Sequence, residues 1–221
     1  MDTISIEATT IPDAWFQTMS RILEKDVAEY KIDLGSFEGQ VRREFDYITI
    51  HIKHPGAMPH VPDIPQWLGI PPPTTQEYVD EYAARYLMTG IKEDNEQYTY
   101  GERLLLSMDK VIDRYKKLGF GTNQLIMQIG QPSDIDLEDP PCLRHIDTRI
   151  KDDKLHFIMY FRSWDLWGGF PANLAGLQQV KEYMAKNIGV EDGEMIVASK
   201  GLHLYGYAID LVKMRMGLGV R

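Results

Sequence analysis

The only cysteine of the chain, Cys142, lies in the segment PPCLRH at residues 140–145. One cysteine cannot form a disulfide within the chain, and it cannot supply the several thiolates of a structural zinc site. Cys142 is therefore either a small side chain packed in the core or a nucleophile. The residues next to it do not decide between these two uses.

A second group of chemically active side chains lies in the segment FRSWD at residues 161–165. Arg162, Ser163 and Asp165 place a cation, a hydroxyl and a carboxylate at the end of an apolar strand pattern, just before a Gly-Gly turn. The planar guanidinium and the hydroxyl together suit the capture of a phosphate. The same residues could form an exposed strand end with a local ion pair, and the segment by itself favours that second interpretation.

Two further motifs give weaker evidence for a function. Three histidines, His51, His54 and His60, lie within ten residues, but in a strand the first two point to opposite faces. We expect partly exposed histidines there and no metal site. The segment GFG at 119–121 lacks a following Lys-Ser/Thr pair and comes after a helical pattern, so it is neither a P-loop nor a dinucleotide-binding motif.

Hydrophobic periodicity indicates the elements that must position these residues. It predicts helices over residues 11–32, 75–90, 102–119, 171–187 and about 207–216, and strands over 41–53, 124–129, 155–161 and 194–199. Thr74 or Thr75 can cap the second helix, and Gly90 and Gly119 suit left-handed helix ends. The proline-rich residues 54–75 predict a loop. Helices and strands mix without regular alternation, which predicts an α/β (α+β) fold in which helices cover a mixed β-sheet.

Composition limits the class of protein. A chain of 221 residues with 43% hydrophobic content can bury a large core, and we expect a single domain over residues 1–221. The net charge of -9 provides no basic excess for nucleic-acid binding, so an anionic ligand needs a local cluster of cations. The sequence shows neither a long apolar run nor a signal-peptide pattern. We therefore expect a cytoplasmic protein that binds neither nucleic acid nor membrane.

Three segments together resemble the cysteine-dependent thymidylate synthase family: Pro141–Cys142, YFRSWDLWGGFPANLAGL at 160–177, and GLHLYGYAIDLVKM at 201–214. The matching positions need no insertion or deletion; they are Cys142, Arg162, Ser163, Asp165, Gly169, Pro171, Asn173, His203 and Tyr205. TYGERL at 99–104 is similar to the family's Tyr-Gly segment. The first hundred residues are only loosely similar, and the short chain is most like the compact archaeal members.

The resemblance implies a homodimer with the thymidylate synthase fold, which methylates dUMP to dTMP with a 5,10-methylene-tetrahydropterin of the folate or methanopterin type as co-substrate and no metal. Cys142 would add to C6 of the uracil ring, and Arg162 would favour its thiolate. Arg162 and Ser163 would hold the phosphate, and His203 and Tyr205 the 3'-hydroxyl.

The remaining site residues concern the base, the carrier and proton transfer. Asn173 would pair with N3 and O4 of uracil, where a cytosine-specific relative has Asp. Asp165 would bind the pterin ring. The family's proton-relay glutamate has two candidate counterparts, Glu77 and Glu81, and we favour Glu81.

The chain departs from the family in two places. The stretch GTNQLIM at 121–127 lacks the arginine pair that family members extend to the partner's phosphate, and the replacement cation could be Arg42, Arg43 or Arg144. The C-terminal MGLGVR differs from the family's apolar tail. These departures keep two alternatives open: a pyrimidine-nucleotide hydroxymethylase on the same fold, and a non-catalytic nucleotide-binding relative.

Overall fold

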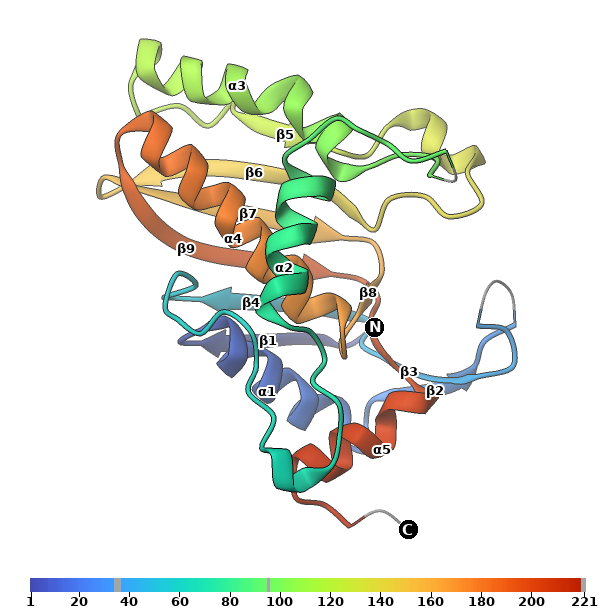
Figure 1. Cartoon of the computed structure of the whole chain (residues 1–221). Coiled ribbons are helices and arrows are strands. Elements are labelled where there is room, and N and C mark those ends of the chain that lie inside the picture. The colour runs from blue at the N-terminus through green and yellow to red at the C-terminus, as the bar shows by residue number, and fades with distance from the viewer. Residues whose placement is uncertain (34–36, 95, 220–221) are drawn as a thin grey trace.

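A computed structural model describes residues 1–33, 37–94 and 96–219 of the chain. In this part of the chain the strands form two sheets (Figure 1). The larger sheet has the order β1 (Thr3–Ala8), β4 (Tyr47–Ile52), β9 (Glu191–Ser199), β7 (Lys154–Phe161), β6 (Leu143–Lys151), β5 (Ile126–Gln128). The smaller has the order β2 (Ala28–Lys31), β3 (Val41–Glu44), β10 (Leu202–Tyr205), β8 (Trp164–Asp165).

Both sheets mix parallel and antiparallel pairs. The longer helices are α1 (Ile11–Ile22), α2 (Gln76–Tyr82), α3 (Tyr100–Leu118), α4 (Gly169–Ile188) and α5 (Gly206–Arg215). Helices α1, α3 and α4 pack on the larger sheet and bury alternate strand residues, as in β4, where Ile48, Ile50 and Ile52 are buried and the residues between them are half-exposed (Figure 1). This arrangement confirms the predicted mixed sheet covered by helices.

Several predicted boundaries were wrong. The first helix ends at Ile22, and Ala28–Lys31 is a strand that pairs with β3. The predicted strand 41–53 is divided, because Phe45 turns into the core between β3 and β4. The helix α2 continues as a π-helical turn to Leu87, so Gly90 does not end it and is not left-handed. Pairing with distant residues accounts for the first two boundaries, since β2 pairs with β3 and the Phe45 N–H donates to the Leu202 carbonyl at 3.0 Å.

Strand β6, over Leu143–Lys151, was not predicted. A register shift between Leu143 and His145 interrupts its alternation, which hides the period of two from the sequence. It forms a hairpin with β7 across the predicted KDDK turn, where Asp152 and Asp153 both have positive φ, at 53° and 55°. Two central residues with positive φ are characteristic of the turn that matches strand twist in a tight hairpin.

Glycine is required where α3 begins. A Cβ on Gly101 would lie 2.1 Å from the carbonyl oxygen of Thr89. The chain therefore packs backbone against backbone at this point, and Tyr100 beside it uses its hydroxyl to accept the N–H of Leu143 at 3.2 Å. The Tyr-Gly pair thus joins the start of α3 to the residue after Cys142.

Candidate active site

The β6–β7 hairpin brings Cys142 and Arg162 together. Leu143, the first residue of β6, pairs with Phe161, the last residue of β7. Cys142 and Arg162 are the next residues outward on each strand, and the Arg162 N–H donates to the Cys142 carbonyl at 2.8 Å. The tight turn at one end of the hairpin therefore brings Cys142 and Arg162 side by side at its other end.

The smaller sheet supplies the second half of the site. Its register places Tyr205 of β10 opposite Arg42 of β3, and His203 opposite Asp165 of β8. These side chains and the hairpin end line one cavity of about 830 Å³. The lining includes six of the predicted residues, Cys142, Arg162, Ser163, Asp165, His203 and Tyr205. A volume in this range suits a ligand of nucleotide size.

Burial, rather than a cation, dominates the state of the cysteine. Burial raises the pKa of the Cys142 thiol more than the neighbouring Arg162 lowers it, and the carboxylate of Asp139 raises it further. Arg162 therefore favours the thiolate, but its effect does not outweigh burial in this arrangement.

Arg162 is engaged by the loop that precedes Cys142. Its Nε donates to the carbonyl of Pro140 at 3.1 Å, and its Nη2 donates to Asp139 at 3.0 Å. The Asp139 side chain is 87% exposed, so it can leave the guanidinium at little cost. An incoming anion can replace this carboxylate on Arg162.

The structure separates the three candidate cations. Arg42 lines the cavity, approaches the Ser163 hydroxyl at 3.4 Å and pairs with Glu44. Arg43 donates away from the cavity, to the carbonyl of Glu24 at 2.7 Å. Arg144 pairs with the buried Asp134 at 3.2 Å.

Arg42 also lies 5.9 Å from the centre of the Tyr205 ring, and its Nε is buried with no hydrogen-bond partner among the described residues. Only this one of the three cations can join Arg162 at a bound anion.

His203 is held as a neutral ring. Burial and the nearby Arg42 lower its pKa to about 3. Its Nδ1 lies 2.8 Å from the Gly201 carbonyl, which only accepts, so Nδ1 carries the proton and donates. The other ring nitrogen, Nε2, is then an acceptor; it is buried and finds no partner in the described part of the chain. A hydroxyl donor on a ligand would satisfy it.

Asp165 has a structural role as well as a place in the cavity. Its carboxylate accepts the backbone N–H groups of Gly168 and Gly169, each at 2.9 Å, at the start of α4. A carboxylate at this position satisfies donors that the first helical turn leaves free. The side chain is therefore fixed in orientation at the cavity wall.

Asn173 does not line the cavity. It lies on the first turns of α4, where its Oδ1 accepts the indole N–H of Trp164 at 3.0 Å and its Nδ2 donates to the Tyr82 hydroxyl at 2.9 Å. Trp164 does line the cavity, so Asn173 adjoins the site through this indole.

The structure does not bring the proposed relay glutamates into the cavity. Glu81 is 62% exposed and pairs with Arg85 at 2.9 Å, and Glu77 is exposed on the same helix. Besides Asp165, the acidic residues that line it are Glu96, Glu138 and Asp139, which come from irregular segments. No periodic pattern or motif marks these three in the sequence, so they were not predicted.

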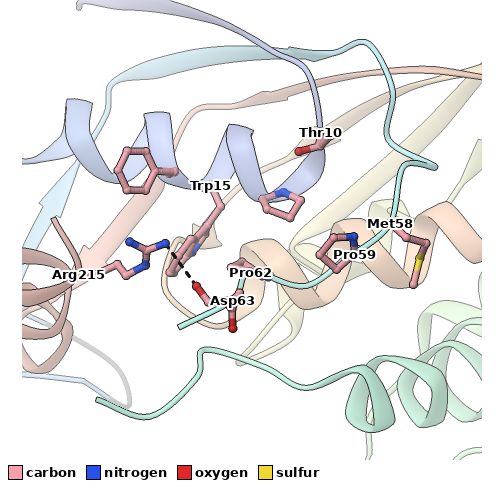
Figure 2. A pocket seen from close by; sticks show the side chains of 9 residues that line it. Thr10, Trp15, Met58, Pro59, Pro62, Asp63 and Arg215 are labelled. Atoms are coloured by element: carbon pink, nitrogen blue, oxygen red, sulfur yellow. Dashed lines mark hydrogen bonds between the residues drawn. The ribbon is translucent and has the colours of Figure 1, made fainter. Parts of the chain in front are cut away.

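A separate pocket of about 280 Å³ lies between α1, the proline-rich loop and α5 (Figure 2). Its walls include Trp15, Phe16 and Met58, and Arg215 enters from α5 and donates to the Asp63 carbonyl at 3.3 Å (Figure 2). It contains none of the predicted site residues. Its Trp15 donates to the Leu166 carbonyl at 2.9 Å, which braces the chain just after Asp165.

The histidines at 51, 54 and 60 do not converge. His51 contacts Glu194 at 2.6 Å, whereas His60 contacts the Gly56 carbonyl at 3.3 Å. Within residues 1–33, 37–94 and 96–219, no group of three or more His, Cys, Asp or Glu side chains is arranged to hold a metal ion. None of the helices in these ranges is long and apolar enough to cross a bilayer.

The fold is shared with a solved structure, and the sequence is similar to named relatives. The 18%-identical thermostable thymidylate synthase A from Bacillus subtilis has the same fold, with a TM-score of 0.69 over 95% of this chain and 84% of that chain. A protein named "Putative thymidylate synthase" from Methanosarcina barkeri (strain Fusaro / DSM 804) is 28% identical over 214 residues, which cover 94% of this chain and 92% of the relative.

Similarity is also found outside the archaea. The protein named "Thymidylate synthase" from Listeria monocytogenes serotype 4a (strain HCC23) is 30% identical over 113 residues, which cover 50% of this chain and 36% of the relative. The family profile described as "Thymidylate synthase" matches residues 90–217, more than half of the chain, including Cys142 and each cavity residue on β8 and β10. The chain belongs to the thymidylate synthase family.

Proposed function

We propose that the protein is a thymidylate synthase that converts dUMP to dTMP, with Cys142 as the nucleophile. The observation that carries the proposal is the position of Cys142 in one cavity with two arginines, Arg42 and Arg162, and one buried acceptor, His203 Nε2, that has no partner among the described residues. A nucleoside monophosphate offers a phosphate for the arginines and a sugar hydroxyl for the histidine.

In the proposed reaction the Cys142 thiol loses its proton to solvent, the sulfur bonds to C6 of uracil, and the electron pair of the C5–C6 double bond moves toward C5 and O4. The carbon at C5 then becomes nucleophilic. C5 then bonds to the one-carbon unit and loses its proton, and the carrier nitrogen leaves, which gives an exocyclic methylene at C5. Hydride from the carrier adds to this methylene, the C5–C6 double bond re-forms, and the sulfur leaves as a thiolate. The bound phosphate displaces the Asp139 carboxylate from Arg162.

The co-substrate is a 5,10-methylene-tetrahydropterin, of the folate or the methanopterin type, which supplies the one-carbon unit and the hydride that reduces it to methyl. Asp165 is suited to bind a pterin ring, since its carboxylate is fixed at the cavity wall by backbone N–H donors. Its position supports the assignment made from the family resemblance.

The relay role of Glu81 remains a proposal from the resemblance. Glu81 would have to leave Arg85 and turn toward the cavity. Comparison of Glu81→Gln with Glu77→Gln and Glu96→Gln tests it. A loss of turnover in the Glu81 variant alone supports the relay, whereas a loss confined to Glu96→Gln assigns proton transfer to the carboxylate that already lines the cavity.

The nucleophile is tested by mass spectrometry after mixing the protein with 5-fluoro-dUMP and methylene-tetrahydrofolate. We expect a covalent adduct on the peptide that contains Cys142, and none in Cys142→Ser. A repeat with a methylene-tetrahydromethanopterin separates the two carrier types.

The mass of the product from dUMP decides the reaction. A methyl product supports the synthase, and a hydroxymethyl product assigns the hydroxymethylase instead. Binding of dUMP without an adduct, and without release of the C5 hydrogen with either carrier, would assign a non-catalytic nucleotide-binding relative.

We further propose that the protein is a homodimer. The face of the larger sheet opposite α1, α3 and α4 presents half-exposed side chains, among them Tyr47, Ile158, Tyr160 and Ile196, and Ile158 is 37% exposed. A second copy would bury this face. Light scattering should give the mass of two chains, and Ile158→Asp should give one. The cytoplasmic location stays an expectation from the sequence.

A further inference from the structure

Trp164 and Asn173 form a hydrogen bond that allows only one orientation of the Asn173 amide. The indole N–H of Trp164 is 3.0 Å from Asn173 Oδ1, and Asn173 Nδ2 is 2.9 Å from the Tyr82 hydroxyl. An indole N–H can donate but never accept. Only the amide oxygen can satisfy it, so the amide cannot be turned over without placing two donors against each other.

Tyr82 does not impose the same restriction. A phenol hydroxyl donates or accepts equally well, and burial raises the pKa of Tyr82, which keeps its proton in place. If the amide of Asn173 turned over, the hydroxyl could rotate and donate to the oxygen instead. Of the two partners, Trp164 alone therefore decides the orientation of the amide.

The indole itself cannot move away. Trp164 is only 2% exposed, and its ring stacks on Phe161 at 4.3 Å and 4° and on Phe170 at 4.4 Å and 20°. Its backbone N–H donates to the Gly201 carbonyl at 2.9 Å. Strand pairing and stacking together hold the donor at one place.

The amide orientation matters because an amide can recognise either pyrimidine. It has two acceptor lone pairs and two N–H donors, and Trp164 and Tyr82 use one of each. One acceptor and one donor are left for a base. Uracil presents a donor at N3 and an acceptor at position 4, and cytosine presents the reverse, so a turned-over amide would match cytosine as well as the present one matches uracil.

We propose that Trp164 is a positioning residue that sets the choice of uracil over cytosine by fixing the amide of Asn173. This inference rests on the proposed function, because it assumes that Asn173 meets the base of a bound pyrimidine nucleotide. It assigns discrimination to a residue that does not itself pair with the base. The indole acts through the single polarity of its N–H group.

The test compares the dissociation constants of dUMP and dCMP, measured by isothermal titration calorimetry, for wild type and Trp164→Phe. Phenylalanine keeps an aromatic ring between Phe161 and Phe170 but removes the N–H. We expect the preference for dUMP over dCMP to fall by roughly tenfold or more, since the turned-over amide no longer leaves a buried donor unpaired. Tyr82→Phe is the matched control, and it should keep the preference of wild type.

If Trp164→Phe lowers the melting temperature, Trp164 can instead be replaced site-specifically by benzothienylalanine. This residue keeps the bicyclic shape of the indole and lacks the N–H. A general loss of structure weakens the binding of dUMP and dCMP alike and does not change the ratio of their dissociation constants. An unchanged ratio in the benzothienylalanine protein would overturn the proposal. If wild type binds neither nucleotide, the proposed function itself fails, which is a different result.

Discussion

The guanidinium of Arg162 donates to the carboxylate of Asp139 at 3.0 Å. Arg162 directly follows β7, and Cys142 directly precedes β6 at the same end of the hairpin. This contact places a negative charge near the thiol that the reaction must ionise. Burial raises the pKa of the Cys142 thiol most, Arg162 lowers it, and Asp139 raises it further. The net direction disfavours the thiolate in the free protein.

Asp139→Asn should lower the pKa of the Cys142 thiol, because it removes a negative charge that disfavours the thiolate. The rate of alkylation by iodoacetamide, followed as a function of pH, should then rise at a lower pH than in wild type. The shift should be small, since the Asp139 side chain is 87% exposed and water screens its charge.

Glu138→Gln is the matched control for this experiment, because Glu138 also lines the cavity but is not among the largest influences on the pKa of Cys142. Its alkylation profile should follow that of wild type. A profile for Asp139→Asn that also coincides with wild type would remove Asp139 from the account of thiol ionisation.

Arg42→Gln should weaken the binding of dUMP by about tenfold to a hundredfold, because it removes a charged donor to the phosphate. Deoxyuridine, which has no phosphate, should bind both proteins equally. Arg43→Gln is the control from the same strand, since the Arg43 guanidinium donates to the Glu24 carbonyl away from the cavity. Equal losses in the two arginine variants would contradict the placement of Arg42 at the phosphate.

Gly176→Ala should destabilise the protein by about 1–3 kcal/mol, the usual cost of overpacking a tight core. A Cβ at this position of α4 would lie 2.8 Å from the ring of Tyr82. The melting temperature checks the prediction, and Gly121→Ala is the control, because a Cβ at Gly121 meets no atom within 4 Å. A melting temperature equal to wild type would mean that α2 and α4 can separate without cost.

The free energy of unfolding should fall as the pH is lowered from about 6.5, partly because of His203. Its folded-state pKa of about 3 lies below the ordinary value near 6.5, so in this interval the unfolded chain binds the proton and the folded protein does not. Roughly 1.5 kcal/mol should be lost between about pH 6.5 and pH 5 through this residue.

Urea denaturation at a series of pH values measures the His203 contribution against His203→Asn. The variant should lose less stability over the same interval, since it has no imidazole to protonate when unfolded. Carboxylates contribute to both profiles and cancel in the comparison. Parallel profiles would show that His203 is not held neutral by the fold.

Local patterns in the sequence predicted much of the fold. The alternation in Tyr47–Ile52 predicted which β4 residues are buried, and Thr75 and Gly119 marked helix ends that the structure confirms, Gly119 with φ of 79°. The spaced motif around Cys142 predicted the family. Each of these signals is short in range or is a pattern of residue types, so it can be recognised without knowledge of the packing.

Tertiary structure alone decided the relationships that matter for chemistry. Arg42 and Arg43 are neighbours in one strand, and only the pairing of β3 with β10 turns Arg42 to the cavity. The protonation of Cys142 depends on burial and on charges from several segments. Asn173 contacts Trp164 and also Tyr82, which is 91 residues away in the sequence. Residue types and periodicity are properties of the chain, whereas burial, charge proximity and hydrogen-bond polarity exist only between parts that folding brings together.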